Sequence, residues 1–154
     1  MNKTVLHKPF EINSIFSGWL NFTISNKSGS KFVTHSLSYL DWAKSNLDFV
    51  FNLELNGSRK YSRFDLEGSE LIIKAWRHVI NSLDTITLEI VLNDEIECLF
   101  YFSYKNFIQS YVRQMKKWEK QYRESFMYEN FDSYDEDTNE CWETENWEEI
   151  CRRV

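Results

Sequence analysis

Alternation of hydrophobic and polar positions dominates the first hundred residues of the chain. In residues 47–55 every second side chain is apolar, and the same pattern runs through residues 86–92 and 96–104. A period of two is typical of a strand that buries one face and exposes the other. These three segments are therefore predicted to be strands.

Turn residues separate the alternating segments. Asn56-Gly57 follows the first one, and both residue types tolerate positive φ, so a hairpin with a return strand at 61–67 is expected. Asn93-Asp94-Glu95 predicts a second hairpin in the same way. Further strands are expected at residues 16–24, 32–39 and 71–76. About seven strands joined mostly by short turns favour a largely antiparallel sheet.

The period changes to that of a helix at Lys105. Apolar residues from Phe107 to Phe126 then fall on one side of a helix, and cationic residues fall on the other. A helix of about 20 residues would be about 30 Å long, enough to cross one face of a sheet. The fold class expected is α+β, with the strands first and one long amphipathic helix packed on them.

Charge divides the chain into two parts. Residues 1–128 carry 16 Lys and Arg against 14 Asp and Glu, and are expected to form a single α+β domain. Residues 129–154 carry 2 against 10, a net charge of −8, with tryptophans and tyrosines among the carboxylates. Carboxylates beside large rings can attract a basic protein and then bury apolar area against it. The candidate partner-binding residues are Glu129, Asp132, Asp135, Glu136, Asp137, Trp142, Glu143, Trp147, Glu148 and Glu149.

Composition excludes several classes of protein. A chain of 154 residues with 42% hydrophobic residues can form the core of one domain. The longest apolar run, residues 98–102, is far shorter than the about 20 residues of a membrane-spanning helix. Three irregularly spaced cysteines suit neither a disulfide scaffold nor a zinc site, and the start of the chain lacks a secretory pattern. We therefore expect a cytoplasmic protein.

Sequence motifs for catalysis are missing. There is no H-E-x-x-H, no G-x-S-x-G and no glycine-rich phosphate loop. His7, His35 and His78 are expected to be structural or surface histidines, and Cys98 alternates with apolar neighbours as a core residue would. Neither a catalytic residue nor a metal nor a cofactor is expected.

Two other classes of function stay open. A small enzyme could use the strand pairs Asp65 with Glu67 or Glu95 with Glu97, although such pairs are usually the solvated face of a sheet. A nucleic-acid-binding module could use the basic helix face, where the cations are spaced three and four residues apart. The acidic segment would repel a nucleic acid, or would fold back and neutralise the helix. The cations are Arg113, Lys116, Lys117 and Lys120 on the helix, and Arg59, Lys60 and Arg63 after the Asn-Gly turn.

The order of the predicted elements over residues 40–122 is itself informative. It consists of Asp41-Trp42, the strand at 47–55, residues 64–68 leading to Leu71-Ile72-Ile73, strands at 85–92 and up to Tyr104, and the helix at 107–122. This layout resembles the small cytoplasmic immunity proteins of bacterial polymorphic and contact-dependent toxin systems. The resemblance implies a stoichiometric inhibitor that binds one toxin domain and has no catalysis of its own. A nuclease-type toxin domain, whose cleft attracts phosphates, would be occluded by the carboxylates together with Trp142 and Trp147.

Overall fold

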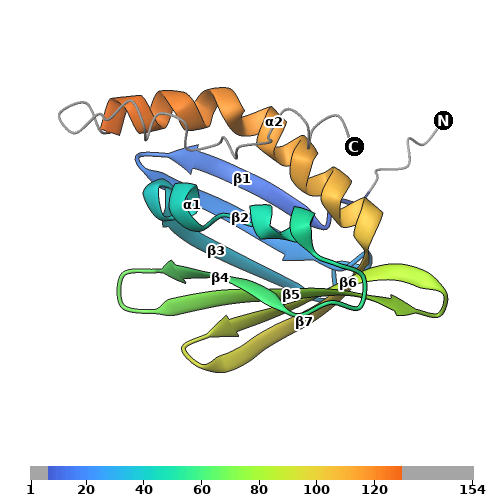
Figure 1. The fold of residues 1–154 in the computed structure, drawn as a ribbon. Helices are drawn as coiled ribbons and strands as arrows, with labels where there is room; N and C mark the ends of the chain where they lie inside the picture. Colours follow the sequence, from blue (N-terminus) through green and yellow to red (C-terminus); the bar gives the residue numbers. More distant parts are fainter. Residues whose placement is uncertain (1–6, 130–154) are drawn as a thin grey trace.

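A computed structural model describes residues 7–129 of the chain, which form seven strands and three helical segments (Figure 1). The class is α+β, as predicted, with a long helix after the last strand. The elements in chain order are β1 (Phe10–Phe16), β2 (Trp19–Ser25), β3 (Phe32–Ser38), α1 (Tyr39–Ser45), the 3₁₀ helix η1 (Asp48–Asn52), β4 (Lys60–Asp65), β5 (Glu70–Ile80), β6 (Leu83–Leu92), β7 (Glu95–Ser103) and α2 (Tyr104–Glu129).

The strands form two antiparallel sheets in place of the one sheet expected from the sequence. The first has the order β1-β2-β3 and the second the order β4-β5-β6-β7. Their edge strands β3 and β7 meet through side chains, because His35 Nε2 lies 2.7 Å from Glu97 Oε2 and Lys31 Nζ donates to the carbonyl of Leu99 at 3.2 Å. Glu97 is the unpaired residue where the β6–β7 register shifts, and such a bulge bends an edge strand away from regular pairing.

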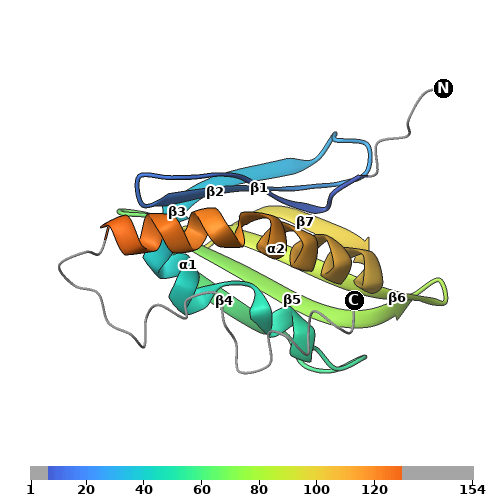
Figure 2. The same cartoon turned by 90° about the horizontal axis from the view of Figure 1, so that it is seen from above.

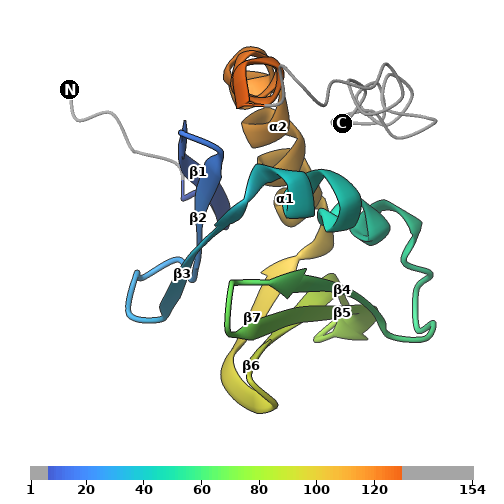
Figure 3. The same cartoon turned by 90° about the vertical axis from the view of Figure 1, so that its left-hand side faces the viewer.

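The helices fill the angle between the two sheets. Seen from above, α2 crosses the molecule along β1, and the end-on view places α1 inside the angle with α2 above it (Figures 2 and 3). The α2 hydroxyl of Ser110 accepts from the Phe10 amide at 3.3 Å and donates to the Phe10 carbonyl at 2.9 Å. Gln114 Oε1 accepts from the Ile12 amide at 3.1 Å. Residues four apart on a helix are separated by about 6 Å along its axis, close to the distance between alternate residues of a strand. Side chains of α2 can therefore form hydrogen bonds with successive backbone groups along the edge of β1.

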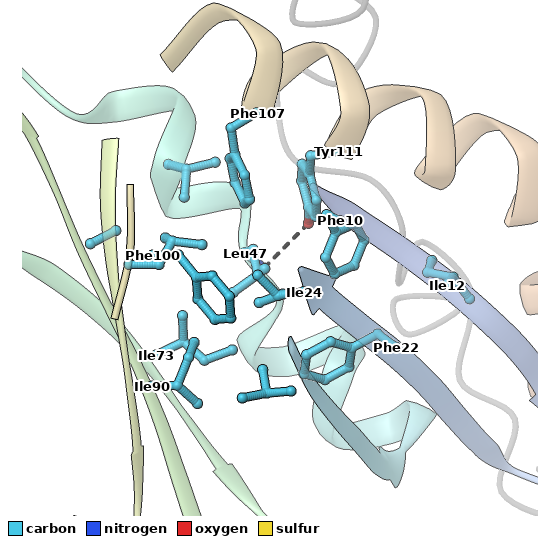
Figure 4. Close-up of a cluster of buried hydrophobic side chains, with 14 of the residues drawn as sticks. Phe10, Ile12, Phe22, Ile24, Leu47, Ile73, Ile90, Phe100, Phe107 and Tyr111 are labelled. Carbon is cyan, nitrogen blue, oxygen red and sulfur yellow. Dashed lines mark hydrogen bonds between the residues drawn. The ribbon is translucent and has the colours of Figure 1, made fainter. Parts of the chain in front are cut away.

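Aromatic side chains join the two sheets and the helices in one core. Trp42 of α1 is fully buried and stacks on Phe10 of β1 and on Phe64 of β4, with ring centroids 5.8 and 5.9 Å apart. Figure 4 shows the adjoining part, where Phe107 and Tyr111 point down from α2 toward Phe100 and the β1–β2 residues. Because alternate strand residues point to opposite faces, burial of this cluster determines which side chains of both sheets face outward.

The predicted strand at 47–55 is wrong. Residues 48–52 form η1, and residue 55 makes a single isolated bridge, so Asn56-Gly57 does not close a hairpin. Leu47, Val50 and Leu53 are the buried residues, and their spacing of three matches the three residues per turn of a 3₁₀ helix. Apolar residues in this segment recur at spacings of two and of three, so the sequence did not distinguish a strand from a 3₁₀ helix. The return strand itself is present as β4.

The segment at 16–24, predicted as one strand, contains the end of β1, a turn and most of β2. Ser17 and Gly18 have φ of 49° and 81° and form that turn. A similar turn at Asn81 and Ser82 lengthens β5 and β6 beyond their predicted ends. The hairpin at Asn93-Asp94 is confirmed, since both residues have positive φ between the paired strands β6 and β7.

The predicted helix is confirmed and is longer than expected. The α2 residues Phe107, Tyr111, Val112 and Met115 are buried, as their spacing predicted. Ser110 and Gln114 lie on the same buried side, which a purely apolar pattern does not reveal.

Candidate functional site

The acidic partner-binding residues predicted from the sequence fall almost entirely beyond the part of the chain that is described. Glu129 is the last residue of α2. The other nine, from Asp132 to Glu149, lie outside the described residues, as does the rest of the predicted segment 130–154. A candidate site among the described residues must therefore come from another surface.

The outer face of the β4–β7 sheet, which looks away from the core, is such a surface. Ile73, Ala75, Leu88 and Phe100 point into the core, so their strand neighbours point outward. The pairing register then aligns outward residues in rows that run across the strands. We call this surface the aromatic face, after its rings Tyr61, Trp76 and Tyr101.

One row of the aromatic face is built around a buried threonine. Thr87 of β6 pairs with Trp76 of β5 on one side and with Tyr101 of β7 on the other. Its hydroxyl lies 2.6 Å from Nε2 of His78, and it has no exposed surface although it faces outward. Trp76 and Tyr101 are two strands apart, which places their backbones about 10 Å from each other. The row is a packed platform with a large ring toward each end.

Arg59 extends this platform over Trp76. Its guanidinium carbon lies 3.9 Å from the centroid of the indole ring, a cation–π contact. Tyr61 follows on β4 and is 59% exposed, as is Tyr101 on β7. Ile96, 60% exposed at the start of β7, adds an apolar residue at the same edge as Tyr101. Exposed aromatic and apolar groups that share one face are typical of a protein interaction surface.

Charges on the aromatic face have both signs and are paired. Lys74 Nζ lies 3.9 Å from Glu89 Oε1 in the row next to Trp76, and Arg63 Nε lies 3.5 Å from Glu70 Oε2. Lys60 Nζ donates to the carbonyl of Asn52 at 3.2 Å. The cluster Arg59, Lys60 and Arg63 predicted as a second basic patch therefore makes intramolecular contacts and does not join the cations of α2.

The outer face of the β1–β3 sheet has a different character. Asn13 Nδ2 donates to Asn21 Oδ1 at 2.6 Å and to Thr23 Oγ1 at 2.8 Å, and Asn21 Nδ2 donates to Ser36 Oγ at 2.6 Å. These polar groups satisfy one another across the strands. The exposed rings Phe16 and Phe32 lie at opposite ends of this sheet.

The cationic face of α2 is present as predicted. Arg113, Lys116, Lys117 and Lys120 are exposed, and Lys117 Nζ lies 5.6 Å from the Trp118 ring centroid. Arg113 also lines a cleft against the segment that precedes β1. This face and the aromatic face belong to different parts of the fold.

Neither of the carboxylate pairs weighed for an enzyme forms a regular pair of alternate strand residues. Asp65 ends β4, and Glu67 follows in the turn with φ of 57°, its amide donating to Asp65 Oδ1 at 2.9 Å. Glu95 is exposed, whereas Glu97 contacts His35. Cys98 is half-buried and packs against the core, as predicted.

Asp48 is the carboxyl that sequence reasoning missed. It lies on η1 beneath α2, where Tyr111 donates a hydrogen bond to its Oδ1 at 2.8 Å. Burial raises the pKa of Asp48 to about 6, and the hydrogen bond from Tyr111 opposes that rise. A strand at 47–55 would have put this residue on a solvated face, so the wrong element concealed it.

Comparisons of the chain with protein-family models, curated proteins and solved structures give no match. None of the helices in residues 7–129 combines the length and the apolar character that a bilayer span requires. The same residues contain no group of three or more His, Cys, Asp or Glu side chains placed to hold a metal ion. The geometry of the aromatic face and of the cationic face of α2 is therefore the basis for assigning a function.

Proposed function

We propose that this chain is a non-enzymatic, cytoplasmic protein-binding module of the immunity-protein type, which neutralises a cationic, nuclease-type toxin domain by occlusion. The observation that carries the proposal is the aromatic face. Tyr61 and Tyr101 stand 59% exposed on β4 and β7, on either side of Trp76, on a sheet whose opposite side is closed by the core. Tyrosine, tryptophan and arginine are the residues that dominate binding energy at protein interfaces.

A protein fits the aromatic face better than a nucleic acid does. Binding to a polyanion depends on cations that are available to phosphates, whereas Lys74 and Arg63 are already paired with Glu89 and Glu70. The face thus offers rings and both signs of charge, the mixture found at protein interfaces. A partner would bury the rings and align its own charges with these pairs.

The acidic segment supplies the preference for a cationic partner. Residues 129–154 carry a net charge of −8, so they favour encounter with a basic domain at low ionic strength. Carboxylates such as Asp135, Glu136 and Asp137 would stand where a nuclease binds phosphates, and Trp142 and Trp147 would bury apolar area beside them. The acidic segment then attracts the partner by its charge, and the aromatic face provides the apolar side chains that anchor it.

The test is protection from a toxin encoded beside this chain. The C-terminal domain of the product of the adjacent upstream reading frame is produced in cells with and without the full-length protein, and growth is followed. The proposal predicts rescue of growth and inhibition of the purified toxin domain at one inhibitor per toxin. Growth arrest that the protein leaves unchanged, or an upstream product without a toxic domain, overturns it.

Variants separate the two surfaces in the same assay. Tyr61→Ala with Tyr101→Ala should reduce protection because both rings are lost from the aromatic face. Asp135→Asn with Glu136→Gln and Asp137→Asn should slow association and weaken its dependence on salt. Phe16→Ala is the matched control, since Phe16 is an exposed ring on the other sheet. An equal loss of protection in Phe16→Ala would show that the aromatic face does not bind the toxin.

A further inference from the structure

A cleft of about 550 Å³ lies between α2, the segment that precedes β1 and the turn that joins β2 to β3. None of the residues that define the aromatic face lines it. Its lining residues are His7, Lys8, Pro9, Lys27, Asn106, Gln109, Ser110, Arg113 and Gln114.

The cleft is positively charged. Lys8, Lys27 and Arg113 come from three separate segments of the chain, and among residues 7–129 no carboxylate lines the space with them. Within residues 7–129 these three cations form no ion pair, whereas Arg63, Lys74 and Arg77 each face an acidic partner. Positive charge that converges on one cavity without compensation attracts an anion.

Hydrogen bonds hold the walls of the cleft in place. Ser110 and Gln114 are buried and bind the backbone of Phe10 and Ile12, which fixes α2 against β1. The Ser25 amide donates to the Pro9 carbonyl at 3.1 Å, and Ser25 Oγ lies 3.3 Å from His7 Nε2. The backbone segments that carry the cations are therefore held against one another before a ligand binds, which lowers the entropic cost of binding.

We propose that this cleft binds a small phosphate-bearing anion. Its volume falls in the range of sites for small molecules, roughly 300–1,000 Å³, and exceeds the space of a single ion. Arg113 can donate two parallel hydrogen bonds to one phosphate, while Lys8 and Lys27 provide charge from the segment before β1 and from the β2–β3 turn. The amides of Asn106 and Gln109 offer further donors to phosphate oxygens.

A small ligand accounts for the cleft better than a nucleic acid lying along α2. Arg113 is the first cation of the row Arg113, Lys116, Lys117 and Lys120, but the other three do not line the cleft. A bound strand would need the whole row. A ligand of the cleft would need Arg113 and Lys27 and would ignore Lys116.

The experiment titrates the full-length protein with inorganic pyrophosphate and follows binding by calorimetry and by amide chemical shifts. Saturable 1:1 binding is expected, with shifts at Lys27, Asn106 and Arg113. Arg113→Ala and Lys27→Ala should each weaken binding about tenfold or more, because each removes a charge-assisted hydrogen bond. Lys116→Ala, which deletes the same charge from the same helix outside the cleft, should change the affinity less than twofold.

Three results would overturn the proposal. The first is no saturable binding of pyrophosphate at about 1 mM, since an anion site with three convergent cations should be occupied there. The second is an equal effect of Lys116→Ala and Arg113→Ala, which indicates diffuse attraction to the helix. The third is tighter binding of a single-stranded oligonucleotide that depends on Lys116 and Lys117, which indicates a nucleic-acid surface. All the substituted side chains are exposed, so thermal unfolding should match the unsubstituted protein.

Discussion

The Tyr111 hydroxyl donates to Asp48 Oδ1 at 2.8 Å and accepts from the Leu47 amide at 3.2 Å, joining α2 to η1 beneath it. The other carboxyl oxygen, Asp48 Oδ2, is buried and has no hydrogen-bond partner in the described part of the chain. A carboxylate in this position is poorly solvated, which explains why burial raises the pKa of Asp48 to about 6. The link between the helix and η1 is thus sensitive to pH.

Stability should fall as the pH rises from about 4 to about 6. The unfolded chain ionises Asp48 near its ordinary pKa of 3.8, whereas the folded chain keeps it protonated up to about 6, so ionisation favours unfolding between these values. The expected loss is about 3 kcal/mol, and it is complete above that window. Urea unfolding at a series of pH values measures it.

Asp48→Asn should flatten this pH dependence. The amide oxygen can still accept from Tyr111, and no ionisation follows as the pH rises. Burial and the neighbouring Asp65 raise the pKa of Asp41 as well, so a smaller slope of the same sign should persist in the variant. An unchanged slope in Asp48→Asn would contradict the assignment of the pH dependence to this carboxyl.

Gln114→Ala should destabilise the protein by about 1–3 kcal/mol. The substitution leaves the amide of Ile12, itself buried, without the acceptor that it now has at 3.1 Å. Chemical denaturation measures the change in the free energy of unfolding. Gln121→Ala, an exposed glutamine on the same helix, is the control and should change it by less than about 0.5 kcal/mol. Equal values for the two variants would refute the role of α2 in satisfying the edge of β1.

Trp42→Ala should cost about 3–5 kcal/mol, because it leaves a cavity between Phe10 and Phe64. Trp42→Phe should cost less. The indole Nε1 is buried without a hydrogen-bond partner among the described residues, so phenylalanine loses volume but no hydrogen bond. Trp19→Ala, on a partly exposed tryptophan, is the comparison in the same denaturation assay. A similar cost at both positions would contradict the central place of Trp42 in the core.

The sequence predicts elements well where one period excludes the others. The α2 segment has apolar residues at helical spacing alone, and β6 and β7 alternate without a competing pattern, so all three were predicted correctly. Residues 47–55 carry apolar side chains at spacings of two and of three, and burial in the folded core selects the second. Tertiary packing made that choice, and no local signal could have made it.

The candidate surfaces were harder to predict from the sequence than the elements were. Trp76, Thr87 and Tyr101 are far apart along the chain, and the pairing of β5, β6 and β7 brings them into one row. The sequence shows these residue types, but only the pairing register of the strands shows that they share one face. Lys8, Lys27 and Arg113 likewise converge through the contact of α2 with β1, which depends on the buried polar residues Ser110 and Gln114.

Binding of a toxin domain through the aromatic face is tested most directly by titrating the purified upstream-encoded toxin domain with the full-length protein. We expect a 1:1 complex whose affinity falls about tenfold or more in Tyr101→Ala and stays unchanged in Phe16→Ala. No complex with the toxin domain, or a complex that Tyr101→Ala and Phe16→Ala weaken equally, would contradict it.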